Sequence, residues 1–448
     1  MAGEWITIRL GSVCSKIGSG ATPRGGGSVY LARGEIALIR SQNVHNDGFR
    51  RDGLAFISPR HAEELQHVEV MPGDVLLNIT GDSVARCCQV DGSVLPARVN
   101  QHVAIIRPDP EKLDPRFLRY FLVSPGMQAR MLSWARSGGT RNALTKGMIE
   151  AFEIFAPADA GEQRAIAHIL GTLDDKIKLN RRMNETLEAM ALMLFKSWFV
   201  DFDPIRAKME GRWRRGQSLP GLPAHLYDLF PDRLVESELG EIPEGWRLGR
   251  FGDVVEQLRE QENPLSSPDA LFHHFSIPAF DEGQTPKLEY GENIKSLKSR
   301  VPPGVILLSK LNPEIERVWL VDVRPGEHAV CSTEFLVLRA LSPLARTYAY
   351  CLARSPVFRQ QIEGLVTGTS KSHQRAQVES ILNLAVVIPP FSIVALFDHP
   401  ADSLLARTLE RRRESRTLAA LRDALLSKLI SGELRVKDAE RLPETVGP

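Results

Sequence analysis

The sequence has 448 residues, of which 43% are hydrophobic and 25% charged, and its formal net charge is +1. This length predicts two or three domains, and the composition is typical of a soluble globular protein. A near-neutral charge gives no global sign of a nucleic-acid or membrane partner, although basic residues can still gather on one face. Five scattered cysteines without a Cys-x-x-Cys pair argue against a structural zinc site. With no signal-peptide pattern at the start, we expect a cytoplasmic protein.

The sequence contains two copies of one unit. Segments that begin at Trp5 and Trp246 open the two halves, and later matches such as Gly73 with Gly304 are 231 residues apart. Each half alternates β-branched runs with Gly and Pro, which predicts a β-rich domain with one or two helices. The expected strands are 35–40, 74–80 and 101–107 in the first half and 305–309, 317–323 and 333–339 in the second, with short helices at 115–122 and 347–354.

A long helix follows the first domain, which we place at 1–157, and spans 158–203. Alternating steps of four and three residues mark an apolar seam with two asparagines at its middle. Its positions are Ile166, Leu170, Leu173, Ile177, Asn180, Asn184, Leu187, Leu194 and Trp198.

The segment 204–245 carries several prolines and reads as a linker with some ordered turns. The second domain occupies 246–390, the second long helix 391–432 and a charged tail 433–448. The second seam includes Leu404, Leu418, Leu425 and Leu429 and is also polar in its middle. One helix of this length cannot bury its apolar stripe on a small domain, so we expect the two helices to pack antiparallel as a coiled coil. The predicted fold is therefore α+β, two β-rich domains separated by two long antiparallel helices, with an internal pseudo-twofold repeat.

Motifs of common active sites are missing from the sequence. There is no phosphate-binding loop with the pattern Gly-x-x-x-x-Gly-Lys-Ser/Thr, no Gly-x-Gly-x-x-Gly and no Gly-x-Ser-x-Gly. Ile388-Pro-Pro-Phe391 resembles the motif with which amino-methyltransferases hold a target amino group, but Ile388 cannot accept the required hydrogen bond. The histidines show no metal-binding spacing, so no metal site is expected. These observations predict a binding protein rather than an enzyme.

Several motifs together resemble one known family. They are Gly18-x-Gly20-x-Thr22-Pro23, Gly73-Asp74-Val75-Leu76, Gly139-Thr140-Arg141, Gly161-Glu162-Gln163 and the run from Leu194 to Pro204. In this order, and repeated over nearly the whole chain, they resemble the specificity subunit of type I restriction–modification systems. One departure is that the second half lacks the Gly-Glu-Gln sequence at the start of its helix, which puts equal docking of partners by the two helices in doubt.

The resemblance implies two target-recognition domains, each of which reads one half of a split double-stranded DNA site. It implies that the helices set the spacing and dock two methyltransferase subunits that carry S-adenosylmethionine and methylate adenine. A separate restriction subunit, the translocase–nuclease, would use ATP and Mg. The chain itself would hold no cofactor and no catalytic residue, and would have no membrane partner.

Polar loops are the candidate DNA contacts, because Arg, Lys, Asn, Gln, Ser and Thr side chains read base edges. The candidate residues are Ser41, Gln42, Asn43, Asn78, Thr80, Thr140, Arg141 and Asn142 in the first domain and Lys310, Asn312, Ser370, Lys371, His373 and Gln374 in the second. Two alternatives remain open from the residues alone. One is a coiled-coil adaptor with protein-binding heads, and the other is a stand-alone DNA-modifying enzyme.

Overall fold

The computed structural model describes residues 4–137, 142–365 and 374–436. The chain divides into two compact units, Met1–Leu179 with Glu414–Pro448 (unit 1) and Asn180–Arg413 (unit 2). Both units are mixed α and β structure, so the predicted α+β class is confirmed. Among the described residues, the model contains no helix that combines the length and apolarity needed to cross a bilayer.

Unit 1 is built on two four-stranded sheets. One has the order β2-β11-β8-β9 and the other β6-β3-β10-β7, while β1 pairs with β12 and β4 with β5. The strands are β1 Trp5–Arg9, β2 Cys14–Ser19, β3 Ile36–Ile39, β4 Val44–His45, β5 Gly48–Phe49, β6 Ala55–Ile57, β7 Glu69–Val70, β8 Val75–Asn78, β9 Cys87–Gln89, β10 Ala97–Val99, β11 Val103–Pro108 and β12 Glu153–Pro157. Its short helices are α1 Pro59–Glu64, α2 Pro115–Val123, α3 Pro125–Ser137 and α4 Lys146–Glu150.

Unit 2 repeats the first of these sheets. The order β16-β24-β21-β22 matches β2-β11-β8-β9, β15 pairs with β25 as β1 does with β12, and a five-stranded sheet has the order β17-β20-β23-β18-β19. The strands are β13 Leu234–Val235, β14 Ile242–Pro243, β15 Arg247–Arg250, β16 Val255–Leu258, β17 Gln261–Glu262, β18 Leu271–Phe275, β19 Lys287–Tyr290, β20 Lys298–Arg300, β21 Ile306–Ser309, β22 Val318–Leu320, β23 His328–Cys331, β24 Phe335–Ala340 and β25 Ala385–Ile388. Its short helices are α6 Asp203–Met209, α7 Ile277–Asp281, α8 Arg346–Arg354, α9 Pro356–Glu363 and α10 Val378–Leu382.

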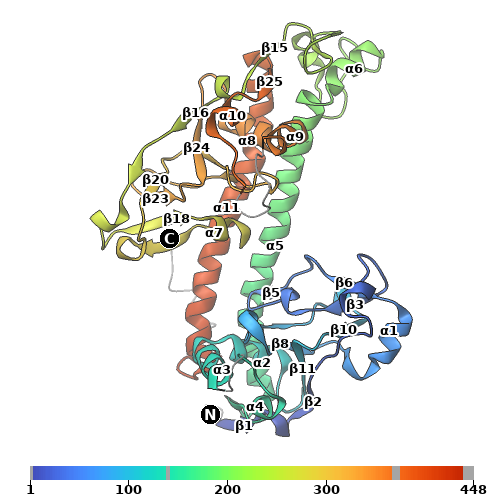
Figure 1. Ribbon diagram of the computed structural model, residues 1–448, viewed down its shortest axis with the longest axis vertical. Coiled ribbons are helices and arrows are strands. Elements are labelled where there is room, and N and C mark those ends of the chain that lie inside the picture. Colours follow the sequence, from blue (N-terminus) through green and yellow to red (C-terminus); the bar gives the residue numbers. More distant parts are fainter. Residues whose placement is uncertain (1–3, 138–141, 366–373, 437–448) are drawn as a thin grey trace. The chain divides into compact units, whose positions relative to one another are not determined.

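The two long helices, α5 Ala160–Phe199 and α11 Phe391–Ile430, have 40 residues each (Figure 1). In unit 2 their paired segments run antiparallel, because Phe195 lies against Phe397 with ring centroids 5.7 Å apart while Asn180 accepts a hydrogen bond from Arg411. In unit 1 the same direction follows from Asp174, which pairs with Arg422, and from Glu162, which pairs with a residue just beyond the end of α11.

The start of α5 is fixed by the side chain of Gln163, which is fully buried. Its oxygen accepts from the backbone N–H of Asp114 at 2.8 Å, and its nitrogen donates to the carbonyl of Pro157 at 2.9 Å. These bonds explain the Gly161-Glu162-Gln163 motif as a joint between the end of β12, the N-cap of α2 and the long helix. The equivalent position in the second repeat is Val394, also fully buried, so α11 uses an apolar contact where α5 uses hydrogen bonds.

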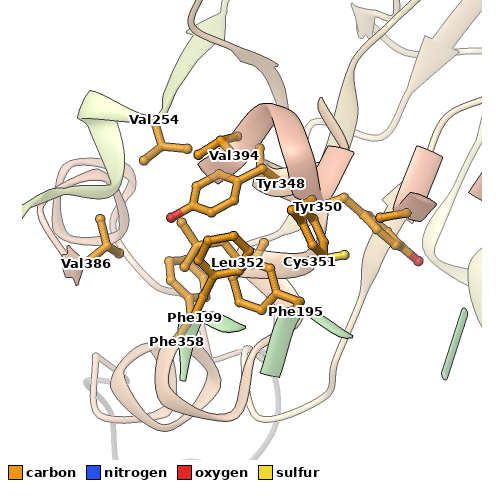
Figure 2. Close-up of a cluster of buried hydrophobic side chains, with 14 of the residues drawn as sticks. Phe195, Phe199, Val254, Tyr348, Tyr350, Cys351, Leu352, Phe358, Val386 and Val394 are labelled. Atoms are coloured by element: carbon orange, nitrogen blue, oxygen red, sulfur yellow. The ribbon is translucent and has the colours of Figure 1, made fainter. Parts of the chain in front are cut away.

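The core of unit 2 gathers aromatic side chains from both long helices and from α8 and α9. Figure 2 shows Phe195 and Phe199 of α5 against Tyr348 of α8 and Phe358 of α9. Phe199 and Tyr348 meet edge to face with centroids 5.3 Å apart, an arrangement that aromatic rings prefer. In unit 1 the corresponding core combines Ile166 and Leu170 of α5 with residues of α2 and the last turns of α11.

The segment 204–245, for which a linker is predicted, is folded against unit 2. Ile205, Trp213 and Phe230 are buried, and Trp198 at the end of α5 packs edge to face on Phe230 with centroids 5.3 Å apart. The indole N–H of Trp213 donates to the carbonyl of Gln217. Helix α5 ends before this segment, where the chain turns through a left-handed conformation at Phe202 (φ 56°).

Candidate nucleic-acid interface

In unit 1 the polar segment that follows β8 is hydrogen-bonded to the residues that follow position 141. The N–H of Leu144 donates to the carbonyl of Ile79 at 2.8 Å, and the N–H of Gly81 donates to the carbonyl of Asn142 at 3.2 Å. Thr80 and Ala143 form an antiparallel bridge between these two bonds. Thr80 and Asn142, which are far apart in the sequence, therefore lie in one paired loop.

Unit 2 makes the same pairing after β21. The N–H of Asn312 donates to the carbonyl of Gln374 at 2.8 Å, and the N–H of Ala376 donates to the carbonyl of Lys310 at 3.0 Å. Asn312 has φ 48° where the equivalent Gly81 has φ 76°, and glycine and asparagine are the residues that most readily adopt this left-handed conformation. The structure thus brings Lys310, Asn312 and Gln374 together. We call these two loops the paired loops.

Two of the candidate residues are buried and bonded to backbone. Asn43 accepts from the N–H of Arg40 and donates to the carbonyls of Arg50 and Asp52. The amide of Asn78 donates to the carbonyl of Ser41 at 2.8 Å. Both side chains are fully buried, so they hold the turn Ser41–Asn43 on the end of β8. Gln42 remains exposed and donates to the carbonyl of Gly53.

Beside the paired loop of unit 1 lies a row of polar side chains. The hydroxyl of Thr80 is 2.6 Å from Nδ1 of His102, the other ring nitrogen of His102 is 3.0 Å from the amide nitrogen of Gln101, and the oxygen of Gln101 meets the hydroxyl of Thr22. Sequence reasoning missed Gln101 and Thr22 as members of this surface. The available signal was the motif Gly18-x-Gly20-x-Thr22-Pro23.

Gly20 in that motif is required by a close approach of two backbone segments. A Cβ at this position would lie 1.9 Å from the carbonyl oxygen of Val99, well inside contact distance. The backbone of Gly20 donates to the carbonyl of Val103 at 2.9 Å, and Ala21 donates to that of Val99 at 3.1 Å. The missing side chain therefore lets the segment that carries Thr22 pack on the sheet next to Gln101.

An ion pair inside unit 1 explains a second motif, Gly73-Asp74. Asp74 is fully buried and binds the guanidinium of Arg107 through two bonds of 2.7 and 2.8 Å. Its carboxylate also accepts from the N–H of Met71. The hydrogen bonds that Arg107 donates to Asp74 raise the pKa of the Arg107 guanidinium. This pair joins β8 to β11 at the end of the sheet away from the paired loop and serves the framework.

In unit 2 the paired loop is held by charged groups of its own. Arg375 forms a two-armed ion pair with Glu334, with distances of 2.8 and 3.1 Å, and the backbone N–H of Lys310 donates to the carbonyl of Glu334. Arg359 of α9 donates to the carbonyl of Pro313, directly after Asn312. Thr140, Arg141, Ser370, Lys371 and His373 lie outside the described residues.

The structure also locates the seam residues of the long helices. Ile166, Leu170, Asn180, Asn184, Trp198 and Leu429 are buried, while Leu173, Ile177, Leu187, Leu194, Leu404, Leu418 and Leu425 are half-buried. Sequence reasoning missed Glu188 and Phe195, which are more deeply buried than the neighbouring Leu187 and Leu194. The described residues contain no group of three or more His, Cys, Asp or Glu placed to hold a metal ion.

Comparison with known proteins gives consistent matches. Residues 2–189, the first repeat, match the family model described as the type I restriction modification DNA specificity domain. The type I restriction enzyme HindI specificity subunit of Haemophilus influenzae is 26% identical over 90% of this chain and 95% of its own length. The MjaIX specificity subunit of Methanocaldococcus jannaschii is 25% identical over 90% and 92%. A crystal structure of the type I restriction–modification S subunit from M. genitalium has a TM-score of 0.53 at 13% identity, covering 96% of both chains.

Two α+β repeats, each with a β-rich domain, a paired polar loop and a long helix, define a duplicated binding protein. The sequence matches make the assignment more specific. Over 90% of its length the chain is similar to type I restriction enzyme specificity subunits, and its first repeat matches the DNA specificity domain of type I restriction–modification systems.

Proposed function

We propose that this chain is the DNA-recognition subunit of a type I restriction–modification complex and carries no active site itself. Each domain, 1–157 and 246–390, reads one half of a bipartite site in double-stranded DNA. The paired long helices fix the spacing between the halves and dock two adenine methyltransferase subunits, and a restriction subunit completes the nuclease. Because the substrate is the DNA of the cell, the complex works in the cytoplasm.

One observation carries this proposal. Each repeat forms a paired loop at the equivalent place on its own four-stranded sheet, but the polar side chains differ. They are Thr80 and Asn142 in the first repeat and Lys310, Asn312 and Gln374 in the second. A shared framework with different hydrogen-bonding groups is what reading two different half-sites requires, because base edges are distinguished by their donors and acceptors.

The proposed base contacts are the members of the paired loops, residues near them in sequence, and Gln42 of the turn Ser41–Asn43. They are Gln42, Thr80, Thr140, Arg141 and Asn142 in the first domain and Lys310, Asn312, Ser370, Lys371, His373 and Gln374 in the second. Ser41 supports the first set through the carbonyl bonded by Asn78. Phosphate contacts then set the register without reading sequence.

The test is to map methylated adenines in host DNA with the gene intact, deleted and restored. We expect one split motif to disappear on deletion and to return on complementation. If no split motif changes, and the chain together with its methyltransferase subunits shows no sequence-selective DNA binding, the proposal is wrong. Methylation by the purified chain alone would instead indicate a DNA-modifying enzyme. Unchanged methylation combined with tight protein binding by the two domains would indicate an adaptor.

A further inference from the structure

In unit 1 one carboxylate of α5 is held between two arginines. Asp174 binds Arg119 of α2 at 2.7 Å through one oxygen and Arg422 of α11 at 2.8 Å through the other. The hydroxyl of Tyr120 also donates to Asp174 at 2.7 Å. The side chains of Arg119 and Asp174 are 10% and 19% exposed, so these bonds are largely shielded from water.

Arg119 also bonds to the loop that begins with the turn Ser41–Asn43. Its second guanidinium nitrogen donates to the carbonyl of Asn46 at 2.8 Å. Asn46 lies between β4 and β5, where β4 directly follows that turn, and its side-chain oxygen accepts from the N–H of Cys87. A continuous path of hydrogen bonds therefore runs from both long helices through Arg119 to a candidate recognition loop.

Unit 2 contains the same arrangement built from other positions. Glu188 of α5 binds Arg354 of α8 at 2.9 Å and Arg412 of α11 at 2.5 Å. The other side of the Arg354 guanidinium pairs with Glu316, which lies in the loop between β21 and β22 that also carries Lys310 and Asn312. The side chains of Glu188 and Arg354 are 11% and 16% exposed.

These two networks are not copies made by the internal repeat. A shift of 231 residues places Tyr350, not an arginine, at the position of Arg119, and Leu405, not a carboxylate, at the position of Asp174. Because the two units make the same arrangement from non-equivalent residues, both need a bond of this kind between α5 and a loop. A buried ion pair adds little net stability, because desolvation offsets its attraction, whereas its directional bonds fix how the groups are arranged.

We propose that Arg119 and Arg354 are positioning residues that hold the recognition loop of their own domain in a fixed place on the paired helices. Each arginine joins a carboxylate of α5 to that loop. It affects DNA recognition only by holding the loop in place and does not itself contact DNA. The inference rests on the function proposed above. If the inference is right, each arginine affects discrimination only at the half-site that its own domain reads.

The test uses paired apolar substitutions that remove each positioning arginine together with its α5 carboxylate, while Arg422 keeps its ion pair with Asp423 and Arg412 keeps its hydrogen bond to Gln284. R119M/D174L acts in unit 1 and R354M/E188M acts in unit 2. Each variant, assembled with its methyltransferase subunits, is assayed for methylation on a DNA library in which every base of both half-sites is varied. We expect each variant to relax discrimination in one half-site by about fivefold or more, since a single mismatch costs about 1–3 kcal/mol. The two variants should relax different half-sites.

Matched controls are exposed ion pairs of the same domains, Arg60–Glu64 and Arg339–Glu256. R60M/E64L and R339M/E256M should leave both half-sites unchanged. If the paired variants fold poorly, R119K and R354K test the same inference. A lysine can keep the ion pair with the α5 carboxylate but cannot bond the carboxylate and the loop at once, as a guanidinium does. They should relax the same half-sites more weakly.

A purely structural role would lower methylation equally at every site and leave the motif unchanged. That outcome, or relaxation of both half-sites by one variant, overturns the inference while the wild-type complex still methylates a split motif. A wild-type complex that methylates no split motif overturns the proposed function itself.

Discussion

The aromatic core of unit 2 makes a direct prediction for Phe195. This side chain is 2% exposed and contacts three other aromatic rings, with centroids 5.0 Å away at Phe199, 5.5 Å at Tyr348 and 5.7 Å at Phe397. Phe195→Ala removes a ring that joins α5, α8 and α11, and the neighbouring elements belong to one closely packed cluster. A buried Phe→Ala substitution loses the free energy of transferring the ring from water and also the packing around it. We therefore expect the free energy of unfolding to fall by about 3–5 kcal/mol.

The assay is denaturant unfolding of the full chain, followed by tryptophan fluorescence, with the transition of unit 2 compared between variants. The matched control is Met193→Ala, two residues earlier on α5, whose side chain is 69% exposed. We expect a change within about 0.5 kcal/mol for the control. If Phe195→Ala destabilises by less than about 1 kcal/mol, or by no more than the control, the packing of α5 against α8 and α11 described above is incorrect.

Three further predictions concern unit 1. Gly20→Ala forces a Cβ onto the carbonyl of Val99 and should destabilise unit 1 by about 2 kcal/mol or more, as measured by thermal unfolding. Gln163→Ala leaves the N–H of Asp114 and a strand carbonyl without their bonds and should cost about 2–3 kcal/mol in denaturant unfolding. Burial opposes ionisation of Asp174, but two arginines hold the pKa of its carboxyl below the ordinary value. The stability that ionised Asp174 adds to the folded state is therefore fully present above about pH 3.9 and is lost as the pH falls through the lowered pKa. The difference in Tm between wild type and Asp174→Asn should therefore shrink below about pH 4.

Each of these has a control. Gly18→Ala, in the same motif, places its Cβ in open space and should change Tm by less than about 2 °C; equal loss at both glycines would contradict the argument from close approach. Glu162→Ala changes a neighbour of Gln163 whose carboxylate makes an ion pair of 3.4 Å, and it should cost less than the Gln163 variant. A Tm difference for Asp174→Asn that grows toward low pH would reverse the expected sign and refute the assignment.

The predicted strands 35–40, 74–80 and 101–107 and the helix 115–122 correspond to β3, β8, β11 and α2, with ends shifted by at most two residues. They were predictable because each is a short run of buried residues bounded by Gly, Pro or Asx. The seam of the long helices was less predictable in detail. A strict alternation of four and three residues drifts against a straight helix, so the buried face moves from Leu187 and Leu194 to Glu188 and Phe195.

The segment 204–245 shows a different limit of sequence reasoning. Prolines and glycines mark its turns, but the burial of Trp213 and Phe230 depends on the end of α5, which local composition does not reveal. Among the candidate contacts, Asn43 and Asn78 carry the same residue type as Asn142, yet two are buried under backbone bonds and one is exposed. Residue type alone does not distinguish these roles.

By itself, the sequence determined the internal repeat, the α+β class, the two long helices and the resemblance to type I specificity subunits. These features follow from the spacing and type of residues along the chain, which can be read without knowing any tertiary contact. Only the tertiary structure showed that each domain pairs two distant polar segments into one loop. The same holds for Arg119 and Arg354, which link α5 to Asn46 and to Glu316 through bonds between residues 38 or more positions apart. Such contacts depend on where the folded chain returns to itself, and that is decided by packing across the whole unit.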